Sequence, residues 1–152
     1  LVLEHDKGDS VGLELLHRYI NGSASFQLTG NVMLNGSIHL EQAELSPFQT
    51  ALLDPVGGPS IAEELDGTSL AALLSGSVYS PSLCAIEMAD LASVFDFDDG
   101  TDRLQQTIQY LEERRLYEDE RWMAALAERR VPTTLNLAEH DPVAVTAEAD
   151  NL

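Results

Sequence analysis

The chain opens with three apolar residues that run directly into a polar turn, in Leu1-Val2-Leu3-Glu4-His5-Asp6-Lys7-Gly8-Asp9. Residues 26–34 are typical of a second buried strand that stops at Asn35-Gly36. The helix expected between them ends at Asn21-Gly22 and places apolar side chains at helical spacing at Val11, Leu15, Leu16 and Tyr19. A strand, a helix and a strand in this order predict an α/β fold with parallel strands.

A different pattern extends from residue 41 to residue 100, where prolines and glycines break the apolar segments and predict an irregular helical insertion. Thr101 is expected to cap a long helix that continues to Ala127. The expected core contacts of that helix are Leu104, Ile108, Leu111, Leu116, Trp122 and Leu126. Residues 131–137 then predict a third strand. We therefore expect a core segment over 1–40, a helical insertion with its return helix over 41–127, and a core segment over 128–152.

The composition excludes several classes of function. The net charge is −18, with 26 acidic residues against eight basic ones, so the clustered positive charge that nucleic-acid binding requires is missing. No apolar run approaches the length of a membrane span, and a soluble, cytoplasmic protein is expected. The single cysteine, Cys84, is expected to be a buried apolar residue, and the sequence predicts no metal site and no cofactor.

Two overlapping motifs offer a nucleophile at the end of the first strand. Gly8-Asp9-Ser10-Val11-Gly12 matches the G-x-S-x-G pattern, in which a serine occupies a strained strand-to-helix turn. His5-Asp6-Lys7-Gly8 offers the same geometry with a carboxylate. Ser10 could occupy the turn only if the charged residues 4–7 extended a buried strand, which is costly. Strand register therefore favours Asp6, and Ser10 is expected to be a helix N-cap supported by Asp9.

The sequence resembles the aspartate-nucleophile α/β-hydrolases, which include epoxide hydrolases and haloalkane dehalogenases. The resemblance is closest to the mesoderm-specific-transcript-like branch. It rests on motifs that occur in the same order along the chain: His5-Asp6-Lys7-Gly8-Asp9, Leu34-Asn35-Gly36, Gln109-Tyr110-Leu111, Arg121-Trp122-Met123-Ala124-Ala125-Leu126 and Asp141-Pro142-Val143.

This resemblance implies a partial α/β-hydrolase fold with a helical cap over the pocket, and a small-molecule substrate such as an epoxide or alkyl halide. Asp6 would attack an electrophilic carbon and form an alkyl-enzyme ester, which a histidine-activated water would hydrolyse. Asp141 would orient that histidine, and the backbone N–H of Lys7 would contribute an oxyanion donor. The candidates for a substrate-contacting proton donor are Tyr79, Tyr110 and Tyr117, of which Tyr110 is preferred.

Some positions depart from the family pattern. Lys7 stands where haloalkane dehalogenases carry a halide-holding tryptophan. Glu4 stands where the strand that leads into the nucleophile turn prefers a small residue. The family's catalytic histidine lies downstream of the acid, but residues 142–152 contain no histidine. His5, His17, His39 and His140 are each expected to be structural or exposed. We therefore expect a fragment that lacks the first strands and the catalytic histidine and has little turnover by itself.

Two alternative functions remain open at the level of sequence. One is a serine esterase that uses Ser10 as its nucleophile. The other is a non-catalytic, hydrolase-like binding protein, which Lys7, Glu4 and the absence of a downstream histidine favour.

Overall fold

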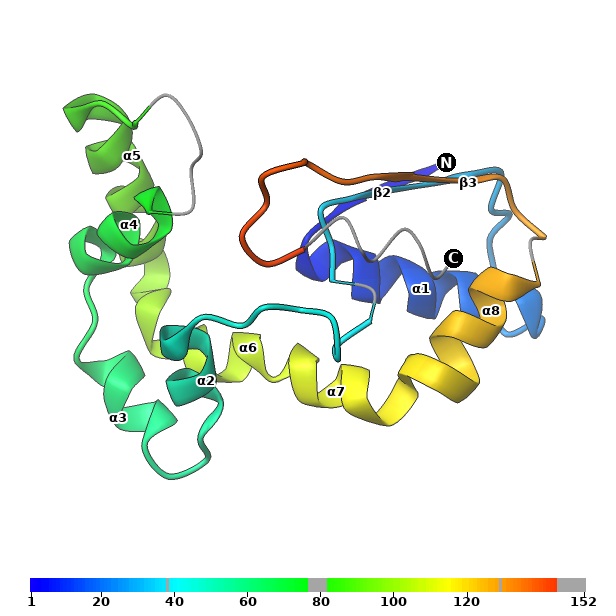
Figure 1. The fold of residues 1–152 in the computed structure, drawn as a ribbon, viewed down its shortest axis with the longest axis horizontal. Coiled ribbons are helices and arrows are strands. Elements are labelled where there is room, and N and C mark those ends of the chain that lie inside the picture. The colour runs from blue at the N-terminus through cyan, green and yellow to red at the C-terminus, as the bar shows by residue number, and fades with distance from the viewer. Residues whose placement is uncertain (38, 77–81, 129, 145–152) are drawn as a thin grey trace. The chain divides into compact units, whose positions relative to one another are not determined.

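A computed structural model describes residues 1–37, 39–76, 82–128 and 130–144 of the chain. It is a mixed α/β structure that divides into two compact units (Figure 1). Unit 1 consists of Leu1–Glu44 and Tyr110–Leu152, and unit 2 consists of Leu45–Gln109. The segment boundaries expected at residues 40 and 127 stay a prediction.

Unit 1 contains a parallel sheet of three strands in the order β1-β2-β3. The strands are β1 (Val2–His5), β2 (Asn31–Leu34) and β3 (Thr133–Asn136), and Asn31 pairs with both Val2 and Thr133. The predicted α/β class with parallel strands is confirmed. Both later strands are shorter than the apolar stretches 26–34 and 131–137, because each pairs over only four residues with its neighbour.

Helix α1 (Lys7–Ile20) covers one face of this sheet (Figure 1). Its buried face contains Leu13 and Leu16 together with Asp9, Ser10 and Gly12. Val11, which the apolar spacing assigned to the core, is 54% exposed. Val11 is exposed because Asp9, Ser10 and Gly12 are buried on the inner face of α1. A search for apolar residues at helical spacing does not detect polar residues or glycine on that face.

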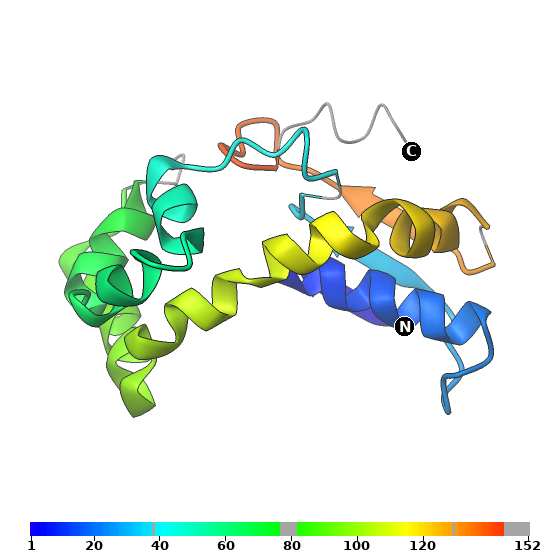
Figure 2. The same ribbon diagram turned by 90° about the horizontal axis from the view of Figure 1, so that it is seen from below.

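The return segment of unit 1 runs alongside α1 on the same face of the sheet, as Figure 2 shows. It consists of α7 (Tyr110–Tyr117), a π-helical turn η3 (Glu118–Met123) and α8 (Ala124–Ala127). Trp122 packs with Leu13 and Met33 in one core cluster, while a second cluster contains Leu16, Leu28, Ala125 and Val131. Leu116 is 74% exposed, so its predicted core contact is wrong, whereas Leu111 and Trp122 are buried as expected.

The remaining helical elements belong to unit 2. They are α2 (Pro47–Leu53), α3 (Gly58–Glu63), α4 (Gly67–Ser75), α5 (Ala85–Asp96), η1 (Phe97–Asp99), η2 (Thr101–Arg103) and α6 (Leu104–Ile108). Two of these helices begin at a residue whose side chain caps the N-terminus. Ser46 forms a capping box with Gln49 at α2, and Asp66 accepts a hydrogen bond from the N–H of Ser69 at α4.

Two sequence expectations in unit 2 are wrong. Thr101 does not cap a single long helix, since it lies inside the short 3-10 segment η2 and the helical path from there is interrupted. Cys84 is exposed rather than buried, because it occupies the N-cap position of α5, where Glu87 completes a capping box. Among the described helices, none combines the length and the apolar character that crossing a membrane requires.

The pairing of α4 with α5 depends on a glycine. A methyl group on Gly67 would overlap the backbone carbonyl oxygen of Ala92, and the N–H of Gly67 donates to Oδ1 of Asp96 at 2.7 Å. We predict that Gly67→Ala lowers the free energy of unfolding by about 1–3 kcal/mol, because the two helices must separate to admit the side chain. Chemical denaturation followed by helical circular dichroism measures this loss.

The matched control is Gly57→Ala in the same unit, where the added carbon would lie 3.5 Å from Oδ1 of Asp54, an ordinary van der Waals distance. Equal stability of the two variants would contradict the close packing of α4 on α5.

Candidate active site

Three polar residues lie after the ends of the three strands, at one edge of the sheet. Asp6 follows β1, Asn35 follows β2, and Asp141 lies in the loop after β3. The carboxyl ends of parallel strands are where α/β proteins place their binding sites. The sheet topology therefore brings together the two acids predicted as nucleophile and orienting acid, although they are far apart in sequence.

Asp6 has a backbone conformation that ordinary residues avoid. Its φ is 54° and its ψ is −117°, and it occupies the N-cap position of α1. Its N–H donates to the carbonyl of Leu34 at 3.0 Å, and its carbonyl accepts from the N–H of Asp9 at 3.0 Å. Such backbone strain costs about 1–3 kcal/mol and concentrates at functional sites. Asp6 thus occupies a sharp turn between β1 and α1.

The surroundings of the Asp6 carboxyl group raise its pKa above the ordinary value. Burial of the carboxyl group is the main cause, and the charge of Asp141 acts in the same direction. His5, Arg114 and a hydrogen bond from the N–H of Lys7 oppose the rise. Asp6 is nevertheless exposed as a whole residue.

Tyr110 lies against the Asp6 carboxyl group. Burial raises the pKa of Tyr110 to about 12, and the charge of Asp6 and a hydrogen bond between the two side chains add to the rise. The ammonium group of Lys7 lies 5.8 Å from the centre of the Tyr110 ring. Of the other tyrosines considered, Tyr117 packs on Trp122 with ring centroids 6.0 Å apart, and Tyr79 lies outside the described residues.

Asp141 is held by three hydrogen bonds. Nδ2 of Asn35 donates to one carboxylate oxygen at 2.7 Å, and the N–H groups of Val143 and Ala144 donate to the other at 2.8 Å each. Burial acts to raise the pKa of Asp141, but these donors outweigh it and hold the pKa below its ordinary value. Asp141 is therefore an ionised, fixed carboxylate, which is the state an orienting acid needs.

Two further carboxyl groups lie buried beneath the turn. Glu4 is 5% exposed and Asp9 is fully buried, and both approach glycines: a methyl group on Gly12 would overlap the Glu4 carboxylate, and one on Gly36 would overlap Asp9. Burial raises the pKa of Glu4 to about 7 and that of Asp9 to about 6. Glu4 is thus accommodated in β1 because Gly12 leaves room for its carboxylate.

Ser10 lies in the first turns of α1 rather than at the strand-to-helix turn. It is buried, and its Oγ accepts a hydrogen bond from the guanidinium group of Arg114 on α7. The predicted N-cap role of Ser10 is wrong, because the N-cap position belongs to Asp6, four residues earlier. Asp9 does lie in the first turn of α1, as expected.

Arg114 is a residue that sequence reasoning missed. It is fully buried, and the charges of Asp6 and Asp9 both lie within its electrostatic reach. Nothing in the sequence distinguishes Arg114 from the other charged residues of α7, because only tertiary packing buries it.

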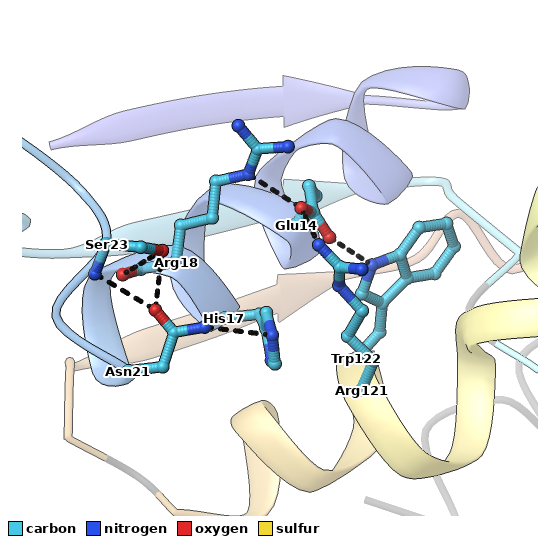
Figure 3. A network of polar contacts seen from close by, with 7 residues as sticks. All are labelled: Glu14, His17, Arg18, Asn21, Ser23, Arg121 and Trp122. Atoms are coloured by element: carbon cyan, nitrogen blue, oxygen red, sulfur yellow. Dashed lines mark hydrogen bonds and ion pairs between the residues drawn. The ribbon is translucent and has the colours of Figure 1, made fainter.

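The polar contacts continue along α1 at the same spacing (Figure 3). The Glu14 carboxylate accepts from Nε of Arg18 at 2.7 Å, from the Trp122 indole at 3.0 Å and from Arg121, as Figure 3 shows. A groove of about 460 Å³ follows this face of α1, and Lys7 and Tyr110 line its end nearest Asp6. The π-helical turn η3 is thereby fastened to α1 through Glu14.

The histidines divide into two pairs. His17 contacts Nδ2 of Asn21 at 3.1 Å, and His39 contacts the carboxylate of Glu118 at 3.3 Å, so both have structural partners. His5 and His140 are exposed neighbours in sequence of Asp6 and Asp141. The catalytic roles of Asp6, Asp141, Lys7 and Tyr110 stay predictions.

The buried Glu4 carboxyl group gives a pH-dependent prediction. Because its folded pKa is about 7 against an ordinary 4.5, its favourable contribution is complete below pH 4.5 and is lost as the pH rises towards 7. We predict that Glu4→Gln gains stability relative to the wild type over this range, reaching about 3 kcal/mol at most. Urea unfolding at a series of pH values measures the difference.

Glu14→Gln is the matched control with the opposite trend. The hydrogen bonds from Trp122, Arg18 and Arg121 overcome the effect of burial and lower the pKa of Glu14, so its contribution is present at neutral pH and is lost as the pH falls. Curves for Glu4→Gln and the wild type that run parallel from pH 4.5 to 7 would contradict the placement of Glu4.

Comparison with known proteins identifies relatives that are named hydrolases. The chain is 34% identical over 148 residues to a protein named "Putative hydrolase LipZ" from each of two strains of Mycobacterium tuberculosis, and the alignment covers 96% of this chain and 50% of the relative. It is 28% identical over 153 residues to the mesoderm-specific transcript protein of Mus musculus, covering 93% of this chain and 43% of that protein.

No family model and no solved structure matches the chain. The chain spans about half the length of the curated relatives it matches. These relatives are consistent with an α/β-hydrolase-like family, in agreement with the parallel sheet and the strand-to-helix turn at Asp6.

Proposed function

We propose that this chain carries the nucleophile and the orienting acid of a hydrolase that acts on small electrophiles, with Asp6 as the nucleophile. The observation that carries the proposal is the strained backbone of Asp6 at the turn between β1 and α1. A carboxylate in that position faces the carboxyl edge of the sheet, where substrate binds in this class of fold. The relatives named as hydrolases support the coarser statement that the activity is hydrolytic.

In the proposed first step, a carboxylate oxygen of Asp6 attacks a carbon of the substrate. A carbon–oxygen ester bond forms while the bond from that carbon to the leaving atom breaks and takes its electron pair to that atom. Water then attacks the carbonyl carbon of the ester, which releases the alcohol and restores Asp6. The N–H of Lys7, which hydrogen-bonds the Asp6 carboxylate, would stabilise the negative oxygen of this second step.

The contact between Tyr110 and Asp6 favours an epoxide over an alkyl halide. An epoxide oxygen leaves as an alkoxide and needs a proton, whereas a halide leaves as a stable anion. With a pKa of about 12, the Tyr110 hydroxyl is protonated at neutral pH and lies beside the attacking carboxylate. Tyr110 would give its proton to the epoxide oxygen and regain one from water.

Asp141 fits the role of the orienting acid, because it is ionised and fixed at the same sheet edge. The base that it would orient is a histidine, and residues 142–152 supply none. Within this chain, ester formation is therefore expected to outpace ester hydrolysis.

The serine-esterase alternative finds less support in the geometry. Ser10 lies inside α1, is buried, and accepts a hydrogen bond from Arg114, so its oxygen is neither exposed nor paired with a base in that contact.

The proposal predicts a trapped covalent adduct. Incubating residues 1–152 with a small reactive epoxide such as styrene oxide should add the mass of one epoxide to the peptide that contains Asp6, because the ester forms without the base that would hydrolyse it. Intact-protein and peptide mass spectrometry measure the adduct, and hydroxylamine should remove it if it is an ester.

Asp6→Asn should abolish the adduct, whereas Ser10→Ala should still form it, with circular dichroism verifying that both variants fold. An adduct that survives Asp6→Asn and disappears in Ser10→Ala would overturn the carboxylate nucleophile in favour of the serine.

A further inference from the structure

Two pairs of side chains connect the turn at Asp6 and the first turns of α1 with helix α7. Asp6 and Ser10 are four residues apart at the start of α1, and Tyr110 and Arg114 are four residues apart on α7. The Tyr110 hydroxyl meets Asp6, and the Arg114 guanidinium donates to Oγ of Ser10. These two contacts connect the N-cap and the first turns of α1 with α7.

Acidic groups outnumber cations around the turn at Asp6. Glu4, Asp6, Asp9 and Asp141 gather at or beneath it, and Arg114 is the one cation among the described residues whose side chain is buried. A buried guanidinium group is strongly unfavourable unless nearby anions and hydrogen-bond acceptors compensate it. Removing that cation would take away a positive charge that acts on both Asp6 and Asp9.

We infer that Arg114 is a positioning residue for Asp6, which holds the first turns of α1, and with them the turn that carries Asp6, through its hydrogen bond to Ser10. This inference rests on the proposed function of Asp6 and assigns the serine of the Gly8–Gly12 motif a new role. Ser10 is the acceptor that fixes the guanidinium group.

The groups that face Asp6 come from several elements. His5 lies on β1, Asp141 follows β3, Tyr110 and Arg114 lie on α7, and the N–H of Lys7 belongs to α1. Arg114 in turn faces Asp6, Asp9, Ser10 and Tyr110.

The test is a substrate-free titration of Asp6. The pH midpoint of the Asp6 carboxyl group is measured by nuclear magnetic resonance on chain containing isotopically labelled aspartate, assigned by its loss in Asp6→Asn. In Arg114→Met the midpoint should rise, because the charge of Arg114 favours the ionised form of the Asp6 carboxyl group. Arg114→Lys keeps the positive charge, so its Asp6 midpoint should return most of the way to the wild-type value.

Arg115→Met is the matched control, since Arg115 is the next residue on α7 and pairs with Glu112 in solvent. It should leave the Asp6 midpoint unchanged. A folded Arg114→Met with a wild-type midpoint, or an equal shift in Arg115→Met, would overturn the inference.

Ser10→Ala keeps the inference testable if Arg114→Met does not fold. It removes the acceptor but retains the charge, so the midpoint should rise by less than in Arg114→Met. An unchanged midpoint would exclude Ser10 as the link. Because the titration needs no substrate, shifted midpoints without any epoxide adduct would refute only the proposed function, and an adduct with unshifted midpoints would refute only the positioning role.

Discussion

The site depends on one backbone constraint, the positive φ of Asp6 between β1 and α1. This turn lets a four-residue strand lead at once into a helix that packs back on the same sheet, with Leu13 and Leu16 in the core. The close packing has two further consequences: Gly12 must make room for Glu4, and Gly36 for Asp9. The strain is sustained because strand pairing fixes one side of Asp6 and the core packing of α1 fixes the other.

Electrostatics then differentiates the carboxyl groups that this turn gathers. Asp141 receives three hydrogen-bond donors and stays ionised, whereas Glu4 and Asp9 are buried and bind protons more readily. Asp6 lies between these extremes, perturbed by burial yet open to solvent. Acidic groups whose surroundings separate their pKa values are a common basis for acid–base and nucleophilic chemistry. Among the described residues, Arg114 is the one buried cation, and its charge acts on both Asp6 and Asp9.

The sequence was sufficient to predict the parallel α/β class, which follows from the order of strand, helix and strand. It also predicted the turn at Asp6, because the first apolar run stops at charged residues. It did not predict the strand lengths, since residues 26–30 are apolar enough for a strand but have no pairing partner in β1. It also missed Arg114, because an arginine on a charged helix such as α7 is ordinarily solvated, and only tertiary packing buries it. The apolar spacing was misleading at Val11 and Leu116, because both side chains lie on helix faces that the described structure leaves exposed.

The central claim is that Asp6 becomes covalently bound to substrate and is regenerated by water. It is tested most directly by turnover in water labelled with heavy oxygen, using an active hydrolase that carries this chain. If water attacks the carbonyl carbon of an Asp6 ester, repeated turnover must place heavy oxygen in the Asp6 carboxylate, which peptide mass spectrometry detects. Product that carries the label while Asp6 carries none would show that water attacks the substrate directly, and would contradict the account.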